Sequence, residues 1–167
     1  MKKPLVIISA PVDTFSGYGA RSRDLIKAIL KCKGEEWNVR VLPQRWGHTK
    51  LGYLKEHNEE QLISLLIQQI PSKPKVWFQV TVPNEFQPVG DFNIGVTAAM
   101  ETTLVHNTWV EGVNRMDLVL TSSEHSKKSL TESVYDAQDN RTGEKTTLKT
   151  TKDIEVLFEG VDLETYT

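Results

Sequence analysis

The sequence has a single cysteine and no long apolar run, and each absence excludes a class of protein. Cys32, alone among 167 residues, cannot form a disulfide framework or a cysteine metal site. No run approaches the roughly 20 apolar residues that a membrane span requires. Residues 5–10, which follow Lys2 and Lys3, are too few for the apolar core of a signal peptide. We therefore expect a soluble, cytoplasmic protein without a membrane span.

The sequence also lacks an excess of charge of one sign. Its 20 Lys and Arg nearly balance 22 Asp and Glu, the net charge is -2, and the basic residues are scattered. A nucleic-acid partner needs a concentrated basic field, so none is expected. No Asp-x-Asp pair occurs, and His48, His57 and His106 have no second histidine or cysteine at ligand spacing. The sequence therefore predicts no metal site.

Short apolar runs alternate with amphipathic stretches along the whole chain. The runs are rich in β-branched residues, which is typical of strands buried on both faces of a parallel sheet. Strands are expected at residues 5–10, 37–42, 76–80, 93–98, 118–121 and 154–158. Helices are expected at residues 20–33, 58–70, 109–116 and 123–134. This alternation predicts an α/β fold with a doubly wound, Rossmann-like parallel sheet.

The sequence also predicts how one helix begins and how one long polar segment is arranged. Asn58 is a candidate cap for the helix at residues 58–70, whose buried side would carry Leu62, Leu66 and Ile70. Residues 135–152 are polar apart from Leu148, so we interpret them as a surface excursion with a threonine-rich hairpin around residues 140–144. The predicted domain spans residues 1–158, and residues 159–167 leave it.

The loop after the first strand carries Gly17, Tyr18 and Gly19 at the start of a helix. Small residues there let a ligand approach the main-chain N–H groups at the positive end of the helix. As a dinucleotide fingerprint the loop fails, because Ser22 stands at the third glycine position. The alternative is a turn that needs glycine for its backbone angles.

Further polar residues follow the third and fourth strands. Asn84 and Glu85 lie in the loop after the third strand, and Thr97 lies near the end of the fourth. Glu101 follows directly and should emerge at the carboxyl edge of the sheet, where it could accept a proton from a substrate hydroxyl. The alternative is a structural glutamate that caps a helix or pairs with Arg115.

A second cluster of polar residues follows the fifth strand. Ser123, Glu124, His125 and Lys127 stand where the next helix begins, so they could hold a phosphate or a sugar. Plain capping of the helix by serine is the alternative. Trp46 lies in a long loop and either packs in the interior or stacks on a sugar face.

Three segments resemble one protein family in their order and spacing. They are Ser-Gly-Tyr-Gly at residues 16–19, Trp-Val-Glu-Gly-Val-Asn-Arg-Met-Asp at 109–117 with Ser-Ser-Glu-His-Ser-Lys at 122–127, and Ile-Glu-Val-Leu-Phe-Glu-Gly-Val-Asp at 154–162. The chain is similar over nearly its whole length to the amino-terminal domain of two-domain glycosyltransferases of the B-type fold (group 1, family 4-like). Met100 and Glu101 stand where many members carry a histidine, and Ser122 replaces a proline.

The resemblance implies a function and a division of labour. In that family the amino-terminal domain mainly holds the acceptor, while a carboxyl-terminal domain or partner chain supplies most contacts to the nucleotide sugar. It implies that Gly17 and Gly19 line the cleft, that Glu101 contacts the sugar or the acceptor hydroxyl, and that Ser123 and Lys127 close the far wall. A nucleotide sugar would be the donor substrate, with no tightly bound cofactor and no metal.

The predicted function is therefore acceptor binding within a glycosyltransferase that moves a sugar from a nucleotide donor to a hydroxyl, with little turnover by this domain alone. Transfer needs donor and acceptor held together away from water, which a cleft between two domains provides. The alternative is a stand-alone domain that binds a carbohydrate or a protein without catalysis. An uncovered apolar patch near residues 158–166 would favour the two-domain hypothesis.

Overall fold

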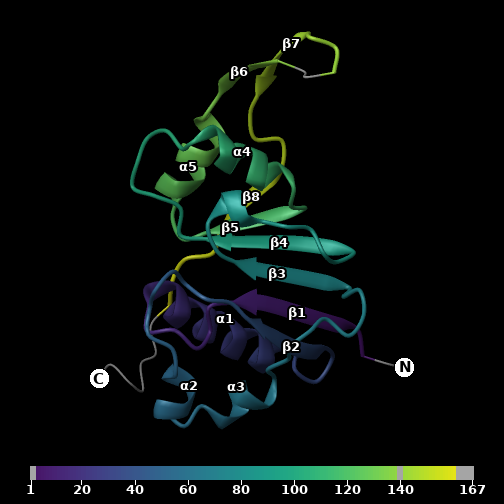
Figure 1. Cartoon of the computed structure of the whole chain (residues 1–167), viewed down its shortest axis with the longest axis vertical. Coiled ribbons are helices and arrows are strands. Elements are labelled where there is room, and N and C mark those ends of the chain that lie inside the picture. The colour runs from purple at the N-terminus through teal and green to yellow at the C-terminus, as the bar shows by residue number, and fades with distance from the viewer. Residues whose placement is uncertain (1–2, 139–140, 161–167) are drawn as a thin grey trace.

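The apolar runs form one parallel sheet at the centre of the molecule (Figure 1). The computed structural model describes residues 3–138 and 141–160. The strands of the sheet are β1 (Leu5–Ala10), β2 (Asn38–Pro43), β3 (Val76–Val80), β4 (Phe92–Thr97), β5 (Leu118–Thr121) and β8 (Asp153–Val156). Their order is β2-β1-β3-β4-β5-β8, and every pairing is parallel. The predicted α/β fold with a Rossmann-like, doubly wound sheet is confirmed.

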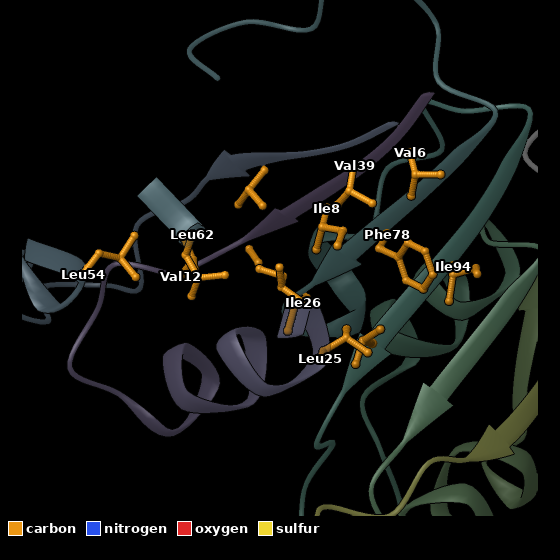
Figure 2. Packing of buried hydrophobic residues seen from close by; sticks show 14 residues of the cluster. Val6, Ile8, Val12, Leu25, Ile26, Val39, Leu54, Leu62, Phe78 and Ile94 are labelled. Atoms are coloured by element: carbon orange, nitrogen blue, oxygen red, sulfur yellow. The ribbon is translucent and has the colours of Figure 1, made fainter. Parts of the chain in front are cut away.

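Helices cover both faces of this sheet because its strands are apolar on both sides. The helical elements are α1 (Gly17–Lys33), α2 (Tyr53–Glu56), α3 (Glu60–Ser64), α4 (Asn107–Asn114), α5 (Glu124–Glu132) and a 3-10 turn, η1 (Pro83–Glu85). Ile8 and Phe78 face Ile26 of α1 in one core cluster, which Figure 2 shows. Ile7 and Trp77 belong to a second cluster with residues of α4 and α5. Alternate residues of each strand therefore feed two separate cores.

The order of strands determines where a ligand would be expected. The chain passes from β1 to its neighbour β2 on one side and then returns to β3 on the other side of β1. Open α/β sheets bind ligands outside the carboxyl ends of their strands, near such a reversal. We call the side of the molecule where the strands end the carboxyl edge and the opposite side the amino edge.

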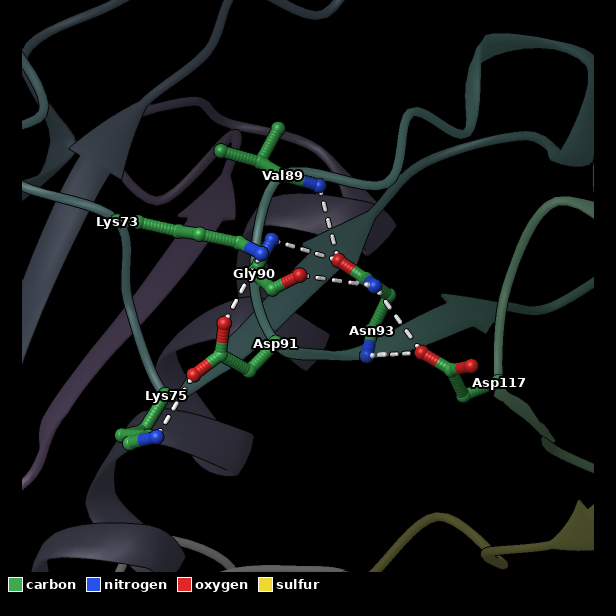
Figure 3. A network of polar contacts seen from close by, with 7 residues as sticks. All are labelled: Lys73, Lys75, Val89, Gly90, Asp91, Asn93 and Asp117. Atoms are coloured by element: carbon green, nitrogen blue, oxygen red, sulfur yellow. Dashed lines mark hydrogen bonds and ion pairs between the residues drawn. The ribbon is translucent and has the colours of Figure 1, made fainter.

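Hydrogen bonds at the amino edge fix the starts of β4 and β5 (Figure 3). The side-chain oxygen of Asn93 accepts from the N–H groups of Val89 and Gly90, both at 2.8 Å. Its main-chain N–H and its side-chain amide donate to Asp117 at 2.8 and 3.0 Å. These bonds hold the start of β5 beside the start of β4.

Asp91, just before β4, pairs with Lys73 and Lys75 at 2.9 and 2.8 Å.

Two expectations about helices are wrong. The helix expected at residues 58–70 ends at Ser64, and Asn58 has a φ of +52° and is not its cap. The chain instead becomes extended and pairs with β2, since Ile67 N–H donates to Val41 O and Leu66 bridges Val41. Main-chain pairing with an open sheet edge thus outweighs the helical period of the apolar residues. Cys32, within the helix expected at residues 20–33, is exposed.

Residues after α5 form the expected hairpin. Its strands are β6 (Tyr135–Gln138) and β7 (Lys145–Leu148), which pair with each other only and project beyond α4 and α5 in Figure 1. The tip expected around residues 140–144 lies partly, and residues 161–167 lie wholly, outside the described residues. No helix in the described part of the chain is long and apolar enough to cross a bilayer.

Candidate functional site at the carboxyl end of β4

The carboxyl end of β4 is held from one side by the first turn of α1. The Tyr18 hydroxyl lies 3.0 Å from the Thr97 hydroxyl and accepts from the N–H of Ala98 at 3.1 Å. Thr97 is buried and also accepts from the N–H of Ala99 at 3.2 Å. Burial, with help from the charges of Glu159 and Glu85, raises the pKa of Tyr18 above its ordinary value, so the phenol is neutral at physiological pH.

The same end of β4 is held from the other side by α5. Ser126 donates to the carbonyl of Ala98 at 3.0 Å, and its hydroxyl lies 3.0 Å from that of Ser123. Ser123 caps α5, because its hydroxyl accepts from Ser126 N–H at 3.1 Å. The capping alternative for Ser123 is therefore confirmed. Through Ser126 that cap also anchors the strand where the predicted site begins.

Between these two anchors the backbone takes an uncommon conformation. Ala99 has a φ of +59°, in the left-handed region that favours glycine. Both the N–H and the carbonyl of its neighbour Ala98 are fixed by side chains. Such strain persists only where surrounding contacts impose it, and it is concentrated at functional sites.

Gly17 and Gly19 are placed at the start of α1, but they differ in their surroundings. Neither has a positive φ, so the backbone angles do not require glycine at either position. A Cβ on Gly19 would lie 2.4 Å from Thr14 O, whereas a Cβ on Gly17 would meet nothing within 4 Å. Gly19 is therefore needed for packing against the loop after β1. Only Gly17 leaves open space for a ligand.

The loop after β2 lies beside this site. The rings of Trp46 and Tyr18 stack, with centroids 4.0 Å apart and an interplanar angle of 20°. The loop is fixed there by main-chain bonds from Phe15 to Lys50 O and from Gln44 to Ala10 O. Trp46 is half-buried, so it packs on Tyr18 and retains some exposed surface.

Asn84 and Glu85 belong to η1, below the end of β3. Glu85 accepts from the buried hydroxyl of Thr81 at 2.5 Å. The carbonyl of Asn84 accepts from Arg115 at 2.8 Å, and Arg115 donates a second bond to Phe86 O. Arg115 thus binds main-chain carbonyls, and the pairing with Glu101 considered as an alternative is not formed.

Glu101 lies in the loop between β4 and α4 and is exposed. It makes no hydrogen bond or ion pair with any of the residues that the structure describes. Its loop also exposes two apolar side chains, with 52% of Met100 and 57% of Leu104 accessible. The carboxylate is therefore available to a ligand.

The three remaining predicted residues on α5 are not joined to Tyr18. Glu124 and His125 are exposed, and His125 borders a cavity of about 170 Å³ with Thr103 and Ser129. Lys127 pairs with Glu155 at 3.5 Å. The structure thus brings Tyr18, Thr97 and Ser123 together and leaves this second group on the outer side of α5.

Sequence reasoning missed a contact from α1 to the segment after β8. Arg21 donates to Leu157 O at 2.6 Å, and its guanidinium lies 3.9 Å from Glu159. Residues 157–160 therefore cross the carboxyl edge from β8 toward α1, as Figure 1 shows. No sequence pattern indicates this partner, although Arg21 does lie two residues after the glycine loop.

A row of polar side chains lies under the site on the face of α4 and α5. It consists of four buried residues, Ser9, Gln79, Thr97 and Thr121. Ser9, Gln79 and Thr121 each lie two positions beyond a residue of the second core cluster. Thr97 and Thr121 are neighbours in the register of β4 and β5. The hydroxyl of Thr121 has no partner among the described residues. A signal was present in the sequence, because three strands of the sheet, β3, β4 and β5, end in or are followed by hydroxyl residues.

The sequence and structure were compared with known proteins. No protein-family model, no curated protein and no solved structure matches this chain. The function must therefore be argued from the site itself.

The site is suited to a neutral, hydroxyl-bearing ligand. Tyr18 and Thr97 share one hydrogen bond, so one of their two hydroxyl protons has no partner among the described residues. Glu101 supplies an exposed acceptor on the next loop. Within residues 3–138 and 141–160, no three His, Cys, Asp or Glu side chains are placed to hold a metal ion.

Proposed function

We propose that this chain is the acceptor-binding domain of a glycosyltransferase that moves a sugar from a nucleotide-sugar donor to a hydroxyl. One observation carries the proposal: residues from each of the three segments that resemble the family, namely Tyr18, Ser126 and Leu157, lie at the carboxyl edge. Tyr18 binds the end of β4, Ser126 binds it from the other side, and Arg21 binds Leu157 of the last segment. Residues far apart in the chain thus converge where a Rossmann-like sheet binds ligands.

Each part of the site has a role in this proposal. The hydroxyls of Tyr18 and Thr97 would hold an acceptor hydroxyl, and Gly17 would leave room for it. Glu101 would accept the proton of the attacking hydroxyl, which is general base catalysis. No metal is assigned a role. An exposed free thiol at Cys32 fits a reducing compartment, so we place the activity in the cytoplasm.

Exposed apolar surface supports a second domain above the site. Phe158 is 78% accessible and Leu157 39%, and both follow β8 at the carboxyl edge. Met100 and Leu104 are exposed after β4, at the same edge. Apolar side chains of this size at one edge are typical of a surface that another domain or chain covers. That domain would bind the donor.

The alternative is a stand-alone carbohydrate-binding or protein-binding domain. In that reading the bond from Arg21 to Leu157 O would serve only to hold the last described segment against α1. In that case the loop bearing Glu101 would bind a ligand without chemistry.

Saturation-transfer NMR on the chain tests the proposal. Neutral mono- and disaccharides, UDP-, GDP- and ADP-glucose, and NADH are titrated separately. We expect a saccharide to bind, the nucleotide sugars to bind weakly, and NADH not to bind. Absence of saccharide binding, or preferential binding of NADH, would contradict the proposal.

Glu101→Gln separates the enzyme from the stand-alone binder. Glu111, also an exposed glutamate without a partner among the described residues, supplies the matched control Glu111→Gln. In an enzyme completed by the donor domain, loss of a general base should lower the transfer rate about 100-fold or more. The control should transfer normally, and both variants should unfold like the parent. Full transfer by Glu101→Gln would sink the catalytic role.

A further inference from the structure

A cavity of about 320 Å³ opens at the amino edge, which is the opposite end of the strands from the candidate site. It lies where β2 begins and where α1 ends. Four apolar side chains line it: Leu30, Trp37, Val39 and Leu65. Its volume is at the lower end of the range of small-molecule sites, roughly 300–1,000 Å³.

Two cations also line the cavity, beside Gly34 and Asn38, and no carboxylate of the described residues does. They are Lys3 and Arg40, and neither forms an ion pair within the described residues. Arg40 donates through Nη1 to Val39 O at 2.9 Å, which leaves its other guanidinium donors for a ligand. Lys3 makes only a 3.5 Å contact with Gly34 O. An apolar surface with two unpaired positive charges at its rim is complementary to an amphipathic anion.

Neighbouring negative groups do not cancel this charge. The carboxyl end of α1 has a partial charge of about −0.5, which is smaller than the two whole charges of Lys3 and Arg40. Glu36 pairs with Lys33 at 2.9 Å. Glu35 is exposed and does not line the cavity. Neither glutamate pairs with Lys3 or Arg40.

We propose that this cavity is a binding site for a small amphipathic carboxylate. The apolar body of the ligand lies against Trp37 and Leu65, and its carboxylate is held by Arg40 and Lys3. The site is separate from the carboxyl edge, so the proposal does not depend on the glycosyltransferase function.

Three ligands with one decyl chain and different head groups test this site. Decanoate, decanol and decylammonium are titrated below their aggregation concentrations while tryptophan fluorescence is recorded. Trp37 lines the cavity, so binding of decanoate should change the emission in a saturable way. Decanoate should bind about threefold to fivefold tighter than decanol, the gain expected of a partly exposed ion pair. Decylammonium should bind weakest.

Variants assign the signal to the cavity. Trp37→Phe should remove the fluorescence change. Arg40→Gln should reduce the affinity for decanoate to that for decanol and leave decanol binding unchanged, whereas Arg45→Gln, at an exposed arginine outside the cavity, should change neither. If Arg40→Gln does not fold, Lys3→Gln at the exposed rim gives the same comparison. Equal affinity for decanoate and decanol, no saturable signal, or a signal that persists in Trp37→Phe would overturn the proposal.

Discussion

At the scale of single residues, Gly17 and Gly19 differ in their tolerance of a side chain. Gly19→Ala places a Cβ 2.4 Å from a main-chain oxygen of Thr14, and should cost about 1–3 kcal/mol in unfolding free energy. Gly17→Ala has open space and should be neutral or stabilise by up to about 1 kcal/mol. Urea unfolding of the two variants measures this difference. Equal destabilisation by both would refute the packing role assigned to Gly19.

Tyr18→Phe removes one hydroxyl and keeps the ring that stacks on Trp46. The N–H of Ala98 loses its acceptor, so the variant should be about 1–3 kcal/mol less stable in unfolding free energy.

The raised pKa of Tyr18 adds a pH dependence of known sign. Folding favours the protonated phenol, so its contribution to stability is complete below pH 10.0 and is lost as the pH rises through the higher pKa of the folded state. The difference in stability between the parent and Tyr18→Phe should therefore shrink above pH 10.0. A difference that stays constant there would show that Tyr18 titrates normally.

The sequence identified several residues of the site but not their contacts. Tyr18 and Thr97 were both predicted, yet their hydrogen bond joins residues 79 positions apart. Such a contact depends on how α1 packs against the sheet near β4, and local sequence patterns do not determine that packing. Gly19 was predicted to admit a ligand, whereas packing against Thr14 is what requires it.

At the scale of elements, Asp91 ties the segment before β3 to the start of β4. The ammonium groups of Lys75 and Lys73 lower the pKa of Asp91 from 3.8 to about 2. A carboxylate with a depressed pKa stabilises the fold above its unfolded value, and this contribution is lost as the pH falls from 3.8 to about 2.

Asp91→Asn should therefore lower the urea midpoint at neutral pH, and the difference from the parent should vanish near pH 2. Asp24→Asn, at an exposed aspartate that forms no hydrogen bond or ion pair among the described residues, is the control and should change little. The side chains are exposed, so added salt should reduce the effect. A difference that persists at the lowest pH would exclude the ion pairs as its cause.

Local patterns predicted the strands better than the helices. β1 and β3, for example, are runs of mostly buried, apolar residues, and that signal is local. Leu66 and Ile70 fit a helical period, but the open edge of β2 offered main-chain partners, and Ile67 pairs with Val41. The competition between a helix and an edge strand is decided by tertiary contacts that the sequence does not display.

At the scale of the whole molecule, the carboxyl edge is where the predicted function would take place. Tyr18, Ser126 and Arg21 connect α1, β4, α5 and the last described segment there. The general location of this site could be predicted, because parallel strands place their carboxyl ends at one edge. The cavity at the amino edge could not, since its lining comes from three separate segments.

Amide shift mapping tests the central claim most directly. The ¹⁵N-labelled chain is titrated with the saccharide that binds best, and the amide signals are followed residue by residue. The account predicts the largest shifts at Gly17, Tyr18, Ala98 and Ser126, and smaller ones in the loop of Glu101. In Tyr18→Phe the same saccharide should bind several-fold more weakly. Shifts centred away from the end of β4, or none at saturating saccharide, would contradict the account.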